Sequence, residues 1–104
     1  MIISVDFDGV LIDHKDIPTR KDWWVDLPME GARESLKLLL QEGHEVYVCT
    51  ARPKEEHTGI TNWLNKHGFP YLEVTNVKKP YTDIYIDDRA YRFTNWNDIY
   101  KLFT

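Results

Sequence analysis

Apolar and polar positions follow one another along this chain in short blocks, and each block has the period of a strand or of a helix. Residues 2–5 are apolar and β-branched but too short for a helix that needs burial, so they predict a buried strand. Residues 30–42 place leucines on one helical stripe, and Gly43 is a good stop for that helix. The same patterns predict strands at 45–49, 71–75 and 83–86, a helix from Pro53 to about His67, and a last helix in the C-terminal tail that packs on the sheet.

The alternation of strands and helices predicts an α/β fold with a parallel sheet and right-handed crossovers. A chain of 104 residues has room for one domain, spanning 1–104. Its hydrophobic content of 42% is that of a folded globular protein rather than a disordered one.

Composition also narrows the setting in which we expect the protein to act. No apolar run reaches the ~20 residues of a membrane span, and the N-terminus enters a strand directly, so neither a membrane partner nor a signal peptide is expected. The one cysteine, Cys49, has no internal disulfide partner and is expected to be a small buried hydrophobe. These features favour a reducing, cytoplasmic location. The formal net charge of −4 argues weakly against broad nucleic-acid binding.

Residues 10–29 are polar, contain two prolines and show no sustained period, so they predict a loop. The loop leaves the carboxyl end of the first strand and is expected to form a small flap over whatever lies there. The pair Trp23–Trp24 is open to two interpretations: one ring plugs the edge of the domain, or the pair forms a wall facing the substrate.

Polar side chains follow three of the predicted strands at their carboxyl ends, where α/β sheets bind ligands. They are Asp6 and Asp8, Thr50, and Asp87 with Asp88, and the pair Lys78–Lys79 precedes the last of these. Each has an ordinary structural explanation: a turn for either acidic pair, a helix N-cap for Thr50, and a solvated loop for the lysines. Together on one edge, the acids, the hydroxyl and the ammonium group predict a site for a divalent metal and a phosphate.

The motifs also occur in a familiar order: DFDGV at 6–10, the Thr of CTARP at 49–53, KKP at 78–80 and YIDDR at 85–89. In this order, over almost the whole chain, the sequence resembles the haloacid dehalogenase-like (HAD) superfamily of phosphohydrolases. The resemblance implies a Rossmann-like three-layer sandwich with a central parallel sheet, in strand order 3-2-1-4 counted along the chain. It also implies a magnesium-dependent phosphatase that forms an aspartyl-phosphate.

The resemblance assigns chemical roles to the residues of the first motif. Asp6 would be the nucleophile, and Mg²⁺ would offset its repulsion from the phosphate. Asp8 would protonate the leaving oxygen and then activate water, and its main-chain carbonyl would contact the metal. Superfamily ATPases usually have Thr at this second position, so Asp8 points to hydrolysis or mutase chemistry.

The other motifs would bind the metal and the phosphoryl group. Thr50, with the N–H groups of Ala51 and Arg52 at the start of the next helix, would hold phosphoryl oxygens. Lys79 would neutralise charge in the transition state and is preferred to Lys78 because it directly precedes Pro80. Asp88 would be the direct metal ligand and Asp87 its neighbour, with the two exchangeable. Arg52 and Arg89 would either hold a second anionic group or be solvated.

The chain lacks the large cap domain of many superfamily members. An open site favours a macromolecular end or a site covered by a partner subunit, although a small phosphorylated molecule still fits, and an oligomer is possible. The alternative function is a phosphate- and metal-binding module with weak or no turnover. A receiver domain is disfavoured because its adjacent acids follow the first strand, and a phosphomutase because it needs a cap to exclude water.

Overall fold

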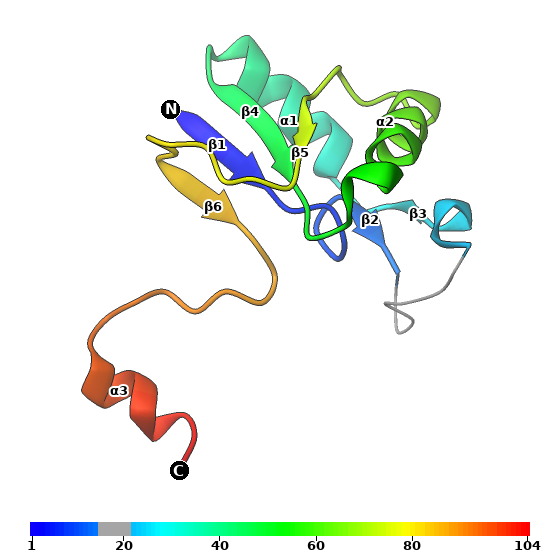
Figure 1. Cartoon of the computed structure of the whole chain (residues 1–104). Helices are drawn as coiled ribbons and strands as arrows, with labels where there is room; N and C mark the ends of the chain where they lie inside the picture. The colour runs from blue at the N-terminus through cyan, green and yellow to red at the C-terminus, as the bar shows by residue number, and fades with distance from the viewer. Residues whose placement is uncertain (15–21) are drawn as a thin grey trace.

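The computed structural model describes residues 1–14 and 22–104 and has a parallel four-stranded sheet at its centre (Figure 1). The strands are β1 (Ile2–Val5), β4 (Glu45–Cys49), β5 (Val74–Thr75) and β6 (Ile84–Ile86). Their order across the sheet is β5-β4-β1-β6, with β1 paired to both β4 and β6. When the four strands are numbered along the chain within this sheet, the order is 3-2-1-4. The details differ from expectation, because β5 keeps only two residues of the expected 71–75 and two further short strands form a separate sheet.

Two helices follow β1 and β4 along the chain. Helix α1 (Ala32–Gln41) ends before Gly43, whose φ of +90° suits glycine at a helix terminus. The second expected helix is split into a short 3-10 turn, η2 (Lys54–Glu56), and α2 (His57–Lys66). Pro53 lies just before the turn in extended conformation rather than inside a helix.

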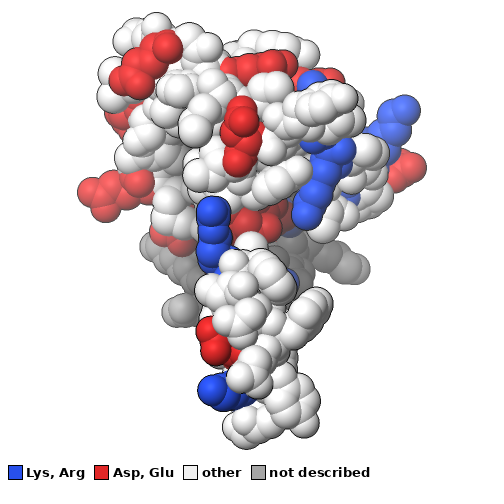
Figure 2. Space-filling model, turned by 90° about the vertical axis from the view of Figure 1, so that its left-hand side faces the viewer, with Lys and Arg blue, Asp and Glu red and all other residues white. Residues whose placement is uncertain are grey.

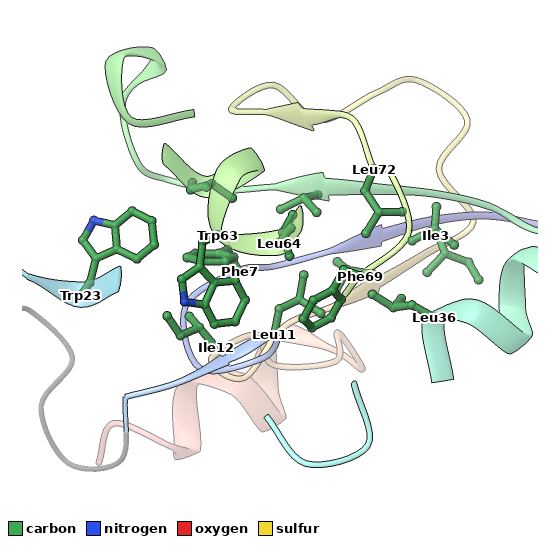
Figure 3. Packing of buried hydrophobic residues seen from close by; sticks show 14 residues of the cluster. Ile3, Phe7, Leu11, Ile12, Trp23, Leu36, Trp63, Leu64, Phe69 and Leu72 are labelled. Atoms are coloured by element: carbon green, nitrogen blue, oxygen red, sulfur yellow. The ribbon is translucent and has the colours of Figure 1, made fainter. Parts of the chain in front are cut away.

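Both helices pack on the same face of the sheet. In β1 and β4 the partners Ile3 and Val46 share that face, as do Val5 and Val48, and all four belong to one buried cluster with Leu36 of α1 and three residues of α2. Figure 3 shows this core from close by. Phe7 lies at its centre, fully buried, with edge-on contacts to Trp23 at 5.5 Å and Trp63 at 5.4 Å between ring centroids. Aromatic pairs of this geometry stabilise a core beyond their buried area alone.

The opposite face of the sheet is covered differently. Tyr47 points to that face, and its hydroxyl is hydrogen-bonded to Thr82 Oγ1 at 2.7 Å and accepts the Lys79 N–H at 3.0 Å. A loop, not a helix, therefore covers this face in the described part of the chain. The expected Rossmann-like arrangement is confirmed for the central parallel sheet and the helices on one face, but the described residues place no helix on the other face.

The last helix, α3 (Trp96–Lys101), stands away from the sheet at the end of an extended segment (Figure 1). Its residues are exposed apart from the half-buried Ile99. The prediction that the tail packs on the sheet is therefore wrong for this structure. Six residues form too short a helix to be stable by propensity, and its residues are exposed among the parts of the chain that the structure describes.

The segment expected to be a flap lies partly outside the described residues, since 15–21 are not described. Its described parts form a small antiparallel sheet of β2 (Ile12–Asp13) and β3 (Leu27–Pro28), with the 3-10 turn η1 (Trp23–Val25) before β3. Trp23 is buried in the core and Trp24 is 55% exposed, which confirms that one ring of the pair plugs the domain edge. Over residues 1–14 and 22–104, the structure contains no helix with the length and apolar character of a membrane span.

Candidate active site

The polar residues predicted at the strand ends meet in one hollow at the carboxyl edge of the sheet. The hollow has a volume of about 680 Å³ and is open to solvent. Most of its lining residues lie in the segments that follow β1, β3, β4, β5 and β6, and two lie in β2 and β4: Asp6, Asp8, Gly9, Asp13, His14, Met29, Cys49, Thr50, Ala51, Asn76, Lys78, Asp87, Asp88 and Arg89.

Three acids form a tight group on one side of the hollow. Carboxylate oxygens of Asp6, Asp87 and Asp88 lie within 4.8 Å of one another. The pKa of Asp6 is raised to about 6, first by burial and then by the charges of the neighbouring acids, against the lowering effect of its hydrogen bond to a backbone N–H. That bond runs from the Phe7 N–H to Asp6 Oδ1 at 2.8 Å and orients the carboxylate. The group is therefore a set of like charges with no basic partner shown among the described side chains.

Gly9 explains how Asp88 reaches this group. Its φ is +78°, and a Cβ placed on it would lie 2.3 Å from Asp88 Oδ2. Two features therefore favour glycine at this position of the DFDGV motif. One is the positive φ, and the other is the Asp88 carboxylate that lies where a Cβ would be.

Asp8 lies in the opposite electrostatic surroundings, although it is only two residues from Asp6. Arg52 binds it in a fork, with Nε 2.9 Å from Oδ2 and Nη2 2.9 Å from Oδ1. His14 Nε2 lies 2.6 Å from Oδ1 as well. Burial alone would raise the pKa of Asp8, but the hydrogen bonds from Arg52 and His14 outweigh it and lower that pKa below its ordinary value. The Asp8 side chain lies outside the three-acid group, so the predicted metal contact of this residue rests on its main-chain carbonyl.

The two partners of Asp8 are themselves held in place. His14 is buried, and its Nδ1 is 2.7 Å from Asp26 Oδ2. Arg52 also binds Glu56 at 3.0 Å and lies over the Trp23 ring at 4.9 Å. The sequence reasoning missed His14 and Asp26. A histidine in the loop just after the first acidic motif was the available signal, but nothing in its spacing indicated that it would turn back onto Asp8.

Thr50 and Ala51 take the positions expected of them beside the hollow. Thr50 is buried, and its Oγ1 accepts the Arg52 N–H at 3.1 Å. It caps a turn and not a helix, because η2 begins only at Lys54. Cys49 also lines the hollow and is half-buried, so it is less buried than the small core hydrophobe that was expected.

The structure reverses the preference between the two lysines. Lys78 lines the hollow, and its ammonium group lies 4.9 Å from the centre of the Tyr85 ring. Lys79 is directed to the other side, where it forms an ion pair with Glu73 and lies over Tyr47. Lys79 directly precedes Pro80 in the sequence, but the course of the loop, which is tied to Tyr47, decides which side chain faces the acids.

Arg52 also differs from expectation. It does not line the hollow, because its guanidinium group is committed to Asp8 and Glu56, so a role in holding the substrate is not supported by its position. Arg89 does line the hollow and is exposed, and its N–H donates to Asp87 Oδ1 at 2.8 Å.

The donor set fits a hard divalent cation. Mg²⁺ prefers carboxylate oxygens and keeps several of its waters, and the three-acid group offers such oxygens beside open solvent. Burial is the main cause of the raised pKa of Asp6 and the neighbouring carboxylates add to it, and a bound cation would lower that pKa again.

Comparison with known proteins gives two partial sequence matches and one match over the whole fold. No protein-family model matches the chain. A Bacillus cereus protein named "Putative nucleotidase" is 46% identical over 46 residues, which are 44% of this chain and 24% of that protein. A protein of the same description from Oceanobacillus iheyensis is 38% identical over 52 residues, 49% of this chain and 28% of that protein. The matched stretch thus spans about a quarter of each curated relative.

The structural match is more extensive. A conserved protein from Bacteroides thetaiotaomicron aligns with a TM-score of 0.67 and 28% identity, covering 99% of this chain and 88% of that one. The α/β architecture with a central parallel sheet is therefore shared with a solved structure of similar length.

Proposed function

We propose that this protein is a magnesium-dependent phosphatase that hydrolyses phosphate monoesters through an aspartyl-phosphate on Asp6. The observation that carries the proposal is the three-acid group of Asp6, Asp87 and Asp88, which adjoins Thr50 and Lys78 in one open hollow. Phosphoryl transfer depends mainly on positioning and on charge stabilisation, and this hollow contains groups for both.

Asp6 is the nucleophile in this proposal. Its Oδ1 is engaged by the Phe7 N–H, so Oδ2 is the atom that attacks phosphorus while the bond from phosphorus to the leaving oxygen breaks. Mg²⁺ held by the three acids would lower the pKa of Asp6 and neutralise charge on the phosphoryl oxygens. Asp88 is the preferred direct ligand because it lies against Gly9, and Asp87 is partly engaged by the Arg89 N–H.

Asp8 moves the protons. It gives one to the leaving oxygen in the first step, and in the second it takes one from the water that attacks the aspartyl-phosphate and releases Asp6. Arg52 and His14 hold its carboxylate in place but also favour its ionised form. An ionised Asp8 is suited to accept a proton in the second step. The rate of the first step, which needs a protonated Asp8, should fall as pH rises.

Thr50 and Lys78 bind the transferred group. The buried Thr50 lines the hollow next to Ala51, and Lys78 lines the same hollow. Lys78 takes the role that the motif pattern had assigned to Lys79, because a cation must face the phosphoryl group to stabilise its charge.

A nucleotide is the substrate class with the most support. Two partial matches carry the nucleotidase name, and the hollow is open enough to admit a base and sugar beyond the phosphate. An oligonucleotide end would fit the same open hollow, and a screen of both classes separates them.

The test is hydrolysis of an aryl phosphate and of nucleoside monophosphates, with and without Mg²⁺, by wild type and by Asp6→Asn. We expect magnesium-dependent release of phosphate that falls by at least about a thousandfold in Asp6→Asn, because the amide is a poor nucleophile. Glu34→Gln, which changes an exposed acid on α1, is the matched control and should retain full activity. Equal turnover by Asp6→Asn and wild type would refute the mechanism.

A binding module with weak turnover is the second candidate, and one observation favours it. Both oxygens of Asp8 are engaged by Arg52, an arrangement that opposes protonation of a general acid. Calorimetric titration with Mg²⁺ and inorganic phosphate separates the two candidates. Binding without hydrolysis of any screened monoester would favour the module.

A further inference from the structure

The C-terminal segment, residues 91–103, is apolar and exposed. Six large apolar side chains within this short stretch are between 54% and 80% exposed: Tyr91, Phe93, Trp96, Tyr100, Leu102 and Phe103. Such a concentration of exposed apolar surface marks an interaction site. Figure 2 shows the segment as the lower part of the molecule, mostly uncharged with a few charged side chains. Trp96, Tyr100 and Phe103 are four and seven residues apart, so they share one side of the helical turn.

The segment is ordered internally but makes little contact with its own domain. Asn95 caps α3 by accepting the Asp98 N–H at 2.9 Å, and Phe93 lies edge-on to Trp96 at 5.9 Å. The hydrogen bonds shown for residues 94–104 all stay within that stretch. The radius of gyration is 14.9 Å, where a compact domain of this length has about 13 Å. The larger radius of gyration agrees with the position of α3, which projects from the rest of the chain (Figure 1).

The same domain leaves an apolar surface uncovered at β6. Ile84, Tyr85 and Ile86 are each at least 40% exposed, whereas the β1 residues that pair with them, from Ile3 to Val5, are buried. A groove of about 530 Å³ runs beside this strand, between it and residues 90–93. The strand is also at the edge of the sheet, because β1 is its only partner in the order of the four strands.

Residues 91–93 form one wall of this groove in their own copy, and we propose that the rest of the segment, residues 96–103, docks on the β6 groove of a second copy, so that two chains exchange segments reciprocally. Each copy contains both the exposed apolar segment and the uncovered groove, so a two-fold exchange satisfies both at once and closes the assembly. Residues 87–95 lead away from the sheet in this structure (Figure 1), and exchange retains this course, whereas docking on the same chain requires it to reverse.

The area available is sufficient for a stable dimer. An aromatic side chain buries about 150–250 Å² when fully covered. Three exposed aromatic residues, Trp96, Tyr100 and Phe103, in each of two segments therefore bury on the order of 800 Å² before Leu102 and the groove itself are counted, and the covered groove brings the total toward the 1,200–2,000 Å² of specific interfaces.

The first experiment measures molar mass by size exclusion with light scattering from about 1 to 200 µM. Wild type should be a dimer at high concentration, and Tyr100→Glu should be a monomer because it places a charge in the apolar contact. Tyr71→Glu is the matched control, since Tyr71 is exposed but lies outside both the segment and the groove, and it should stay dimeric. A wild type that is monomeric throughout, or a Tyr100→Glu variant that dimerises as wild type does, would overturn the proposal.

The second experiment distinguishes exchange from docking on the same chain. Tyr85→Cys and Trp96→Cys are combined in a Cys49→Ser background, so that the two new thiols are the only ones. Exchange predicts a disulfide-linked dimer on a non-reducing gel, formed at least tenfold faster than with Tyr85→Cys paired to Tyr71→Cys. A cross-linked species of monomer size, or no preference over that control pair, would contradict exchange. Neither readout depends on phosphatase activity.

Discussion

Two acids of one motif, Asp6 and Asp8, occupy opposite electrostatic regions of the same hollow. Asp6 lies among like charges with Asp87 and Asp88, and its pKa is raised to about 6. Asp8 lies between Arg52 and His14, which lower its pKa. Burial raises the pKa of both carboxyl groups, and only at Asp8 do the hydrogen bonds from Arg52 and His14 outweigh it.

The comparison teaches how one motif can supply two kinds of chemistry. A set of unpaired acids attracts a cation, and once the cation binds, Asp6 becomes an anionic nucleophile. A carboxylate that is already paired needs no cation and can exchange protons instead. Pairs of titratable groups whose surroundings shift their pKa values in opposite directions are typical of acid–base sites.

Among the variants that leave both acids in place, the largest effect is expected from filling the space that the three-acid group needs. Gly9→Ala should weaken Mg²⁺ binding and lower turnover by at least about tenfold, because its Cβ would displace Asp88. Gly31→Ala is the matched control: Gly31 has nearly the same positive φ, +81°, but nothing within 4 Å of its Cβ position. Both variants should lose about 1–2 kcal/mol of stability from the backbone conformation.

Calorimetric Mg²⁺ titration and urea unfolding of the two glycine variants separate these effects. Equal loss of Mg²⁺ affinity in both variants would mean that metal binding by Asp88 does not require the space beside Gly9.

A smaller effect is expected on the Asp8 side. Arg52→Gln removes a cation that stabilises ionised Asp8, so the pKa of Asp8 should rise. The limb of the pH profile on which turnover falls with rising pH, as Asp8 loses its proton, should then move to higher pH. The measurement is kcat/KM for an alkyl phosphate, whose poor leaving group needs the acid, from pH 4 to 9.

Arg33→Gln serves as the control for Arg52→Gln. Arg33 also pairs with an acid, the exposed Glu34, but it does not contact Asp6 or Asp8 in the hydrogen bonds and ion pairs shown. An unchanged pH profile in Arg52→Gln would show that Asp8 does not control the proton transfer.

The smallest expected effect is on stability and follows from the raised pKa of Asp6. Between about pH 4 and pH 6 the folded protein retains a proton that the unfolded chain releases, so this contribution to stability is present at low pH and lost as pH rises through 6. Asn does not titrate, so the Asp6→Asn variant should not lose stability in this pH range. Without metal at pH 7, the variant should gain on the order of 1 kcal/mol relative to wild type, after allowance for solvent screening.

Urea unfolding in EDTA at pH 4, 5, 6 and 7 measures the stability difference. Adding Mg²⁺ at pH 7 should then stabilise wild type more than Asp6→Asn. A stability difference that does not change with pH would contradict a raised pKa at Asp6.

Local pattern was enough to predict the elements that form the core. The β-branched run of β1 and the leucine stripe of α1 are periodic, and burial of a periodic face leaves little freedom in its structure. The parallel direction of the strands follows from the alternation of strands and helices. The tail had a similar pattern of apolar residues, but a pattern does not specify which surface a helix covers, and here α3 covers none of its own sheet.

The sequence by itself determined which chemistry gathers at the edge of the sheet, because strands of a parallel sheet end on the same side and carry their polar residues there. Only the tertiary structure decided the pairing within it: that Arg52 binds Asp8, that His14 turns back to the same carboxylate, and that Lys78 faces the hollow while Lys79 faces Glu73. These choices depend on loop paths and on distances of a few ångströms, to which electrostatic and hydrogen-bond energies are most sensitive and about which residue spacing contains no information.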